Sequence, residues 1–409
     1  MTEDRRPYTI VSVGGIYRLN WEDCGVQITA DKVRESSRTA PTAEIRITAY
    51  PEGHITWTTL NLMNTKARAD VVKFCEERAS SAFRDWPAIM EELALAVIER
   101  HRQGEPVVEL GEVKPSLEPH YRLAPLMLEG ENTLIYGEGG IGKSYIAALA
   151  GVLVDKNLTF GRLEPMKGNV LYLDYETGKN VTARRVNALQ NGFGLSERSN
   201  ILYRFCWQPV ANDISELQRI VAENDIELVI VDSAGPACGG EPEAASSAIQ
   251  YFTALRSLHV TTLTIAHKSK GAGIGPFGSV YWVNYPRNTF ELRRAQDEGC
   301  NIIHVSLAHR KANEGQLLKS TSYRFEFLEG QVRVGSESIE DVPDFFDSLP
   351  LADKIAHTLR SQGASSAKEL AEEVDAKLRS VQVTLSNDKR FYNNRDAHTW
   401  ELRDGSEST

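Results

Sequence analysis

One short stretch constrains this chain more than any other. An apolar run, residues 134–136, leads directly into a loop with the spacing Gly-x-x-x-x-Gly-Lys-Ser. An apolar, alanine-rich segment follows at once and predicts a helix over residues 145–154. The glycines let the backbone curl so that its N–H groups point at one anion, and the N-terminus of the helix favours negative charge there. Strand, loop and helix in this order predict a phosphate-binding loop.

Nine consecutive residues are expected to surround the phosphates: Gly137, Glu138, Gly139, Gly140, Ile141, Gly142, Lys143, Ser144 and Tyr145. In loops of this kind the lysine reaches the β- and γ-phosphates, and the hydroxyl after it binds Mg²⁺. We therefore expect Lys143 to contact the phosphates of ATP and Ser144 to be a ligand of Mg²⁺.

The composition is that of an ordinary globular protein. The chain has 409 residues, which at about 150 residues per domain predicts two or three domains. It contains no run of about 18 apolar residues, so we expect no membrane span. The N-terminus lacks the pattern of a signal peptide, and five scattered cysteines without a Cys-x-x-Cys pair argue against disulfides and structural zinc. A cytoplasmic location is expected.

The net charge of −10 bears on possible partners. It disfavours a protein that is basic over its whole surface. It leaves room for a basic groove or pore, because local charge decides whether phosphates bind.

The order of patterns predicts three folded domains. The boundaries that we expect are an N-terminal α+β accessory domain (1–104), a linker (105–125), an ATP-binding α/β domain (126–335), a second linker (336–350), a winged-helix domain (351–403) and a tail (404–409). In the first domain, two alternating runs around Pro51-Glu52-Gly53 predict a hairpin. Trp57 and Trp86 are expected in its core, with stacking on nucleic-acid bases as the alternative.

Near-continuous apolar strands alternate with amphipathic helices over residues 126–334. This pattern predicts a mostly parallel sheet with helices on both faces. Ligands of such sheets bind beyond the carboxyl ends of the strands. Three polar residues, Glu176, Asp232 and His267, follow or end predicted strands and are expected to meet at that edge.

The roles of these carboxylates can be separated. Asp232 ends an apolar strand and is expected to hold Mg²⁺. The residue after it is Ser233, so the base that activates water cannot be the next residue, as it is in some ATPases. Glu176 is the predicted base, and Asp174, which lies deeper in the same strand, is the alternative.

These features together resemble the RecA-like fold. Over about residues 126–334 the chain looks most like the DnaB/RepA-type hexameric ATPases and their phage and plasmid relatives. The resemblance implies that His267 senses the γ-phosphate and that the glycine-rich segment 268–278 contacts DNA, with Lys268 and Lys270 at phosphates. A surface loop without ligand is the alternative for these lysines.

The resemblance also implies residues that act on the ATP of a neighbouring subunit. The family carries a strand-end Lys-x-Arg there. In this chain Lys311 fits the lysine, but Asn313 stands at the arginine, so Arg310 is the candidate substitute finger. A surface Arg-Lys pair without this role is the alternative. An arginine finger supplies much of the charge stabilisation in phosphoryl transfer, so this departure puts strong cooperative hydrolysis in doubt.

Residues 351–402 predict three helices and a hairpin, the winged-helix pattern. Lys377 and Arg379 are candidates for duplex DNA binding, with Lys389, Arg390 and Arg395 at the wing. Intervening aspartates make protein contact or subunit docking an equal alternative.

The sequence therefore predicts a motor ATPase that uses Mg²⁺ and ATP on single-stranded DNA. A hexameric replicative helicase of a mobile element, working with replication or recombination proteins, is the first interpretation. An ATP-gated DNA-binding regulator or recombination adaptor that does not unwind DNA is the alternative. A small-molecule kinase would leave the C-terminal domain without a role.

Overall fold

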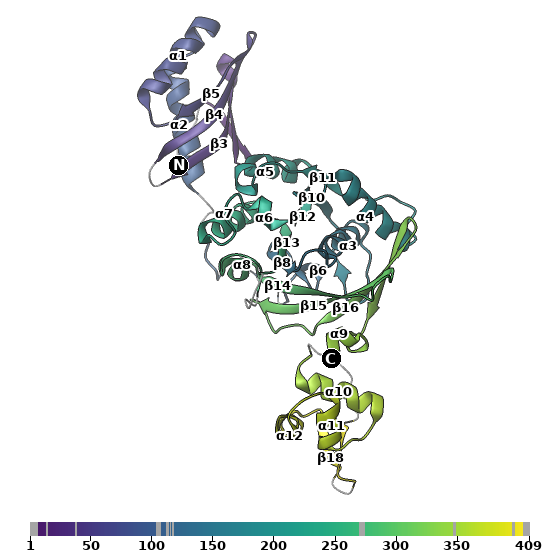
Figure 1. The fold of residues 1–409 in the computed structure, drawn as a ribbon. Coiled ribbons are helices and arrows are strands. Elements are labelled where there is room, and N and C mark those ends of the chain that lie inside the picture. Colours follow the sequence, from purple (N-terminus) through teal and green to yellow (C-terminus); the bar gives the residue numbers. More distant parts are fainter. Residues whose placement is uncertain are drawn as a thin grey trace.

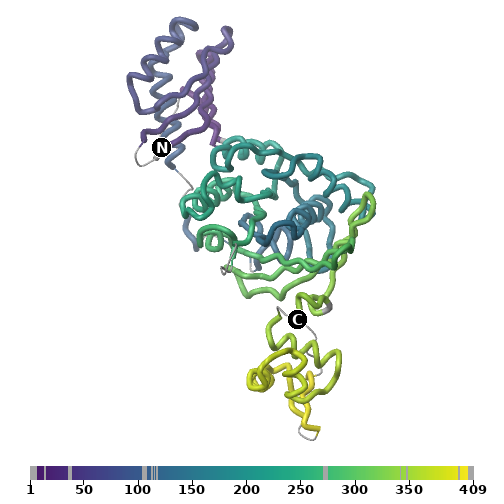
Figure 2. The backbone as a smooth tube through the Cα atoms, viewed as in Figure 1, coloured from purple at the N-terminus to yellow at the C-terminus, as the bar shows by residue number. Residues whose placement is uncertain are grey.

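The computed structural model describes residues 7–13, 15–36, 39–103, 108–111, 114, 116, 118–269, 275–346, 349–394 and 397–403. These residues form a large central unit with a smaller unit at either end of the chain (Figure 1). The tube in Figure 2 shows that the chain passes through the three units in sequence order.

The N-terminal unit is an antiparallel sheet covered on one face by two helices. Its elements are β1 (Thr9–Val13), β2 (Ile16–Trp21), η1 (Glu22–Cys24), β3 (Val26–Ser36), β4 (Thr39–Ala49), β5 (Gly53–Asn61), α1 (Thr65–Ala79) and α2 (Trp86–Gln103). The strands lie in sequence order, β1-β2-β3-β4-β5. The predicted hairpin is confirmed as β4 and β5, whereas β1 to β3 were not predicted.

Alternation along the strands builds a closed core in this unit. Inward residues such as Leu19, Ile28 and Ile45 are fully buried with the inner faces of α1 and α2. Trp86 is 1% exposed and belongs to this core, as expected. The prediction is wrong for Trp57, which is 61% exposed because its position in β5 faces away from the helices.

The central unit contains the large sheet and the helices around it. Its elements are β6 (Tyr121–Ala124), β7 (Met127–Leu128), β8 (Asn132–Gly137), α3 (Lys143–Lys156), β9 (Glu164–Pro165), β10 (Asn169–Asp174), α4 (Lys179–Gly192), β11 (Leu202–Phe205), η2 (Val210–Asn212), α5 (Ile214–Glu223), β12 (Ile226–Asp232), α6 (Ala234–Ala237), α7 (Ala245–Arg256), β13 (Thr261–His267), α8 (Tyr281–Asn284), β14 (Asn288–Ala295), β15 (Ile302–Ala312), β16 (Thr321–Leu328) and β17 (Gln331–Glu337).

The large sheet has nine strands in the order β11-β10-β12-β13-β8-β14-β15-β16-β17. The pairs from β11 to β14 are parallel, and those from β14 to β17 are antiparallel. The predicted α/β fold with a mostly parallel sheet is confirmed. Strand β8, which leads into residues 137–145, lies at the centre of the sheet between β13 and β14.

Successive residues of the parallel strands enter different cores, which is why these strands read as continuous apolar runs. In β10, Tyr172 packs with α3 and α4 on one face, and Leu173 packs with α5 and α7 on the other. Both side chains are fully buried. The carboxyl ends of β8, β10, β12 and β13 consequently meet at one edge, where the predicted site residues lie.

The predicted linkers are more ordered than expected. Tyr121–Ala124 forms β6, which pairs with β7 and β9, and Leu123 is fully buried in the central core. In the second linker, residues 336–350, η3 (Ile339–Asp341) and α9 (Pro343–Phe346) are regular elements. Val342 and Phe345 pack on Ala295 of β14, so apolar burial holds this acidic segment in place.

The C-terminal unit has three helices followed by a two-stranded hairpin: α10 (Leu351–Gln362), α11 (Ala367–Glu373), α12 (Leu378–Asn387), β18 (Phe391–Asn394) and β19 (Thr399–Leu402). A capping box opens α11, because the Ser366 hydroxyl accepts from the Glu369 N–H and the Glu369 carboxylate accepts from the Ser366 N–H. A small core that includes Ile355, Leu370 and Val381 closes the unit.

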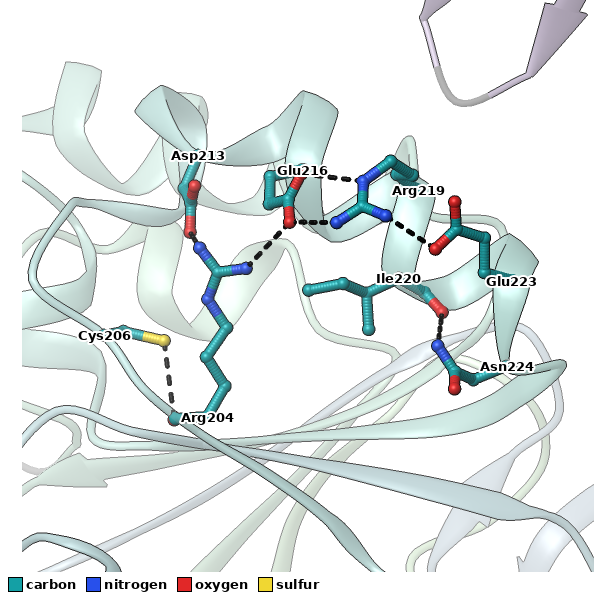
Figure 3. A network of polar contacts seen from close by, with 8 residues as sticks. All are labelled: Arg204, Cys206, Asp213, Glu216, Arg219, Ile220, Glu223 and Asn224. Atoms are coloured by element: carbon teal, nitrogen blue, oxygen red, sulfur yellow. Dashed lines mark hydrogen bonds and ion pairs between the residues drawn. The ribbon is translucent and has the colours of Figure 1, made fainter.

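The turn between β1 and β2 approaches α5 of the central unit. Gly15 has φ +72°, and a Cβ added there would lie 3.0 Å from Oε1 of Gln218. Around this point α5 carries a row of ion pairs, with Arg204 bonded to Asp213 at 2.6 Å (Figure 3).

Among the described residues, no helix is both long and apolar enough to cross a bilayer.

Candidate functional site

The phosphate-binding loop joins β8 to α3 with the predicted geometry. Gly140 and Gly142 have φ of 73° and 97°, values that favour glycine. A Cβ on Gly137 would lie 2.7 Å from the carbonyl oxygen of Leu292, so the close packing of β14 requires glycine there.

Lys143 begins α3 and is 7% exposed. Its ammonium group donates to the carbonyl oxygens of Gly137, at 3.0 Å, and of Glu138. Burial lowers the pKa of Lys143, and the nearby carboxylates of Glu176 and Asp232 oppose that shift. The lysine is thus held inside the loop, where an incoming polyphosphate would meet it.

Asp232, at the end of β12, is buried beside the start of α3. The Tyr172 hydroxyl donates to its Oδ2 at 2.7 Å. Burial raises the pKa of Asp232, and hydrogen bonds from Tyr172 and Ser144 only partly oppose this. Ser144 and Asp232 are therefore neighbours, as predicted.

This pair fits Mg²⁺, which prefers hard oxygen donors and in nucleotide sites takes only one or two protein ligands. A hydroxyl and a carboxylate provide such donors. Within the described residues, no group of three or more histidine, cysteine or acidic side chains is placed to hold a metal. The rest of the coordination shell would come from phosphate and water.

Glu176 lies beyond the end of β10, with its carboxylate facing two polar side chains. The Ser233 hydroxyl donates to its Oε1, and Nε2 of His267 lies 3.6 Å from the same oxygen. The three residues come from the ends of neighbouring strands. The sequence placed Glu176 and His267 at this edge, but gave Ser233 no role beyond excluding a glutamate.

The alternative base, Asp174, has a different task. Its carboxylate accepts hydrogen bonds from the backbone N–H groups of residues 176–178 and from the hydroxyls of Thr177, Thr182 and Tyr203. Burial would raise the pKa of Asp174, but these hydrogen bonds outweigh it and leave the pKa lowered. Asp174 is fully buried, so it shapes the loop that carries Glu176 and does not reach the cleft.

One cleft of about 430 Å³ joins these groups, a volume typical of small-molecule sites. It is lined by the loop from Gly140 to Tyr145 and by Glu176, Asp232, Ser233 and His267. Sequence reasoning therefore found most of its polar groups.

Two arginines of the cleft were missed. Arg185 of α4 has a buried Nη1 without a hydrogen-bond partner among the described residues, and its guanidinium lies 5.8 Å from the ring centre of Tyr145. Arg294 of β14 donates to the carbonyl oxygen of Gly140 at 2.6 Å. Both stand on elements far from the loop in sequence, and no local motif marks them.

The residues predicted to act on a neighbouring subunit lie outside this cleft. Lys311 pairs with Thr289 near the start of β14, away from the edge that carries the phosphate loop. Its ammonium donates to the carbonyl oxygens of Asn284, at 2.7 Å, and of Pro286. Burial lowers the pKa of Lys311.

Arg310 and Lys268 share one buried carboxylate. Glu291 of β14 is 2% exposed and accepts from Lys268 at 2.7 Å, from Arg293 at 3.2 Å and from Nε of Arg310 at 2.9 Å. Burial would raise the pKa of Glu291, but these cations lower it to about 2. The ammonium of Lys268 is thus engaged within the chain, and the predicted finger is held at the same point.

The remaining predicted nucleic-acid contacts divide into two groups. Lys270 and Arg395 lie outside the described residues. Lys377 and Arg379 are exposed at the beginning of α12, where their binding role stays a prediction. Arg390, just before the β18–β19 hairpin, is bonded to Asp388 and Asp353, both at 2.7 Å, which reduces its availability to DNA.

Comparison with known proteins agrees with this site. A family model described as an AAA domain matches residues 100–273, less than half of the chain. No curated protein matches the chain. Among solved structures, a KaiC-like protein from the hyperthermophilic archaeon Pyrococcus horikoshii OT3 is 15% identical, with a TM-score of 0.40, over 54% of this chain and 99% of that protein. The stretch matched by the family model contains β8, the phosphate-binding loop and strands β10, β12 and β13, so this match and the geometry of the site both indicate a nucleotide-binding domain.

Proposed function

We propose that this chain is a motor ATPase that hydrolyses ATP with Mg²⁺ and moves on single-stranded DNA as a hexameric ring, the role of a replicative helicase of a mobile element. The observation that carries the proposal is the meeting of Lys143, Asp232 and Glu176 at one cleft, with His267 beside Glu176. Replication or recombination proteins would be its partners.

Each side chain has a definite task in this proposal. Lys143 would leave the carbonyls of its own loop for the phosphates, and Ser144 and Asp232 would hold Mg²⁺, which neutralises phosphate charge. Glu176 would take a proton from the attacking water, with Ser233 orienting its carboxylate. Arg185 and Arg294 would add positive charge where it develops on the phosphates.

His267 gives the proposal its link to movement. It ends β13, and the next residue, Lys268, donates its N–H to the carbonyl oxygen of Gly137 at 2.9 Å. The segment after it was predicted to contact DNA. A change at the γ-phosphate would therefore reach that segment through one side chain and one backbone bond.

The test is ATP hydrolysis by the full chain with and without single-stranded DNA. We expect DNA to stimulate the parent, and Lys143→Ala to reduce turnover by about a hundredfold or more, because a preorganised charge at the phosphates is lost. An exposed lysine elsewhere, changed in Lys368→Ala, serves as the matched control. Turnover in Lys143→Ala equal to that of the parent, with no stimulation by DNA, would refute the proposal.

A second candidate function follows from Glu291. Arg310 forms an ion pair with this carboxylate, so it could reach the ATP of a neighbouring subunit only by breaking that pair. Asn313 stands where the resembling family has arginine. Slow turnover would suit an ATP-gated DNA-binding regulator or recombination adaptor. Duplex binding that disappears on deletion of residues 351–409, without unwinding, would favour this candidate.

A further inference from the structure

The face of the N-terminal sheet opposite α1 and α2 carries one continuous row of side chains across all five strands. Register places Val11 beside Arg18, Arg18 beside Thr29, Thr29 beside Arg46, and Arg46 beside Trp57. We call these five residues the open-face row. Arg18, Arg46 and Trp57 are exposed in the complete chain, so the neighbouring units leave the row accessible.

Trp57 and Arg46 of this row form a cation–π pair. The Arg46 guanidinium lies over the Trp57 ring, 5.4 Å from its centre. Because Trp57 is 61% exposed, most of the ring remains available to a further planar group. The guanidinium is itself a planar cation on which a base can stack.

The two arginines of the row have no ion-pair partner among the described residues. Two carboxylates on the same face, Asp31 and Glu44, lie beside the row. Asp31 accepts from the backbone N–H of Lys32 at 2.6 Å, and Glu44 is bonded to the Lys32 ammonium at 3.1 Å. A chain with a net charge of −10 thus carries two arginines without an ion-pair partner in the open-face row, beside an exposed indole. Positive charge next to an aromatic platform is complementary to a chain of phosphates and unstacked bases.

We propose that the open-face row is a binding site for single-stranded nucleic acid, with bases stacked at Trp57 and Arg46 and phosphates at Arg18 and Arg46. A duplex would not fit this chemistry, since its bases are stacked inside. Protein interfaces are also enriched in tryptophan and arginine, but their buried cores are apolar, and Val11 is the only other apolar side chain in the row. The site needs neither ATP nor a ring, so it goes beyond the proposed function and can fail separately from it.

The experiment measures binding of a fluorescein-labelled thirty-nucleotide oligothymidylate to the full chain without nucleotide, by anisotropy. Trp57→Ala is expected to weaken binding by about tenfold or more, because stacking on one aromatic residue is worth about that much. Phe83→Ala is the matched control, since Phe83 is 82% exposed in the α1–α2 loop of the same unit. It is expected to bind like the parent.

The salt dependence of binding tests the role of the two arginines separately from that of Trp57. In single strands each neutralised phosphate contributes about 0.7 to the slope of log affinity against log salt. Arg18→Ala with Arg46→Ala should therefore reduce that slope by about 1.4. Unchanged far-ultraviolet circular dichroism and ATP hydrolysis without DNA would show that the variants remain folded.

A spectroscopic signal separates this site from any contact made by the ATPase domain. Trp207 is the control residue, because its exposed indole lies in the central unit. Oligonucleotide should quench tryptophan fluorescence in the parent and in Trp207→Phe, but much less in Trp57→Phe. Equal quenching in Trp57→Phe and the parent, an unchanged salt slope, or no binding of oligothymidylate by the parent would each overturn the proposal.

Discussion

The Glu176 carboxylate accepts a hydrogen bond from Ser233 and faces His267 across 3.6 Å. Glu176→Gln keeps the size of the side chain but cannot accept a proton. We expect turnover to fall by about 10²- to 10⁴-fold, the usual contribution of a general base. Single-turnover hydrolysis together with fluorescent ATP-analogue binding checks this, and binding should be no weaker than in the parent, because the substitution removes one negative charge from the cleft.

Asp174→Asn should behave in the opposite way. The asparagine presents an NH₂ group to donors that now meet a carboxylate oxygen, so several hydrogen bonds to a charged acceptor are lost. We expect a loss of about 3 kcal/mol in the free energy of unfolding. Urea denaturation measures it. An unchanged stability with a large loss of turnover would mean that Asp174, and not Glu176, serves as the base.

Individual residues of the cleft are predictable from the sequence where they directly follow a strand. They are missed where only the folded chain brings them to the cleft. Glu176, Asp232 and His267 were placed because parallel strands end at one edge. Arg185 and Arg294 were not, because a helix face and an antiparallel pairing carry them to the cleft. Trp57 was misplaced because alternation in β5 does not reveal which face of the sheet the helices cover.

Among the elements, β14 carries the only carboxylate in the described residues that holds three cations at once, Glu291. Its pKa of about 2 lies below the ordinary 4.5, so the charged form is favoured by folding. The stabilisation is therefore complete above about pH 4.5 and is lost as the pH falls toward 2.

Glu291→Gln should accordingly destabilise the chain by about 1–3 kcal/mol at neutral pH, because charged hydrogen bonds are lost. The difference from the parent should shrink as the pH drops below about 4.5. Urea unfolding at several pH values measures it. Glu326→Gln, on β16 of the same sheet and paired with Arg324 at 3.4 Å, is the control that should change little. A difference independent of pH would contradict the assignment.

The predictability of elements follows their length and burial. Strands β12 and β13 and helix α5 belong to the alternating pattern predicted over residues 126–334, because long apolar or periodic runs are explicit in sequence. The two-residue strands β7 and β9 exist only through pairing with β6, so no local pattern announces them. The acidic segment after β17 reads as a linker, and a few apolar contacts give it structure.

For the whole molecule, the N-terminal unit encloses a hydrophobic core that shares no buried residue with the central cores. Residues 1–104 expressed alone should therefore fold and unfold in one cooperative transition. Urea denaturation should give a slope of about 1–3 kcal/mol/M, as for small domains. A gradual, non-cooperative loss of the near-ultraviolet signal would show that the unit depends on α5.

The proposed ring predicts a change in mass. With an ATP analogue and an oligonucleotide, light scattering should give six times the 45.5 kDa of one chain. Lys143→Ala should remain smaller under the same conditions, because assembly would be coupled to bound phosphate. A mass of 45.5 kDa under every condition would exclude the ring while leaving the phosphate-binding loop untouched.

The carbonyl oxygen of Gly137 serves two donors from distant parts of the chain, the ammonium of Lys143 and the backbone N–H of Lys268. A triphosphate that attracts the ammonium withdraws one of them and leaves the other with an unshared acceptor. The hydrogen bond from the Lys268 N–H, which anchors the segment after His267, would then become stronger when nucleotide binds and weaker when it leaves. Nucleotide bound at the phosphate loop would in this way change a backbone hydrogen bond directly, before any side chain outside the cleft has moved.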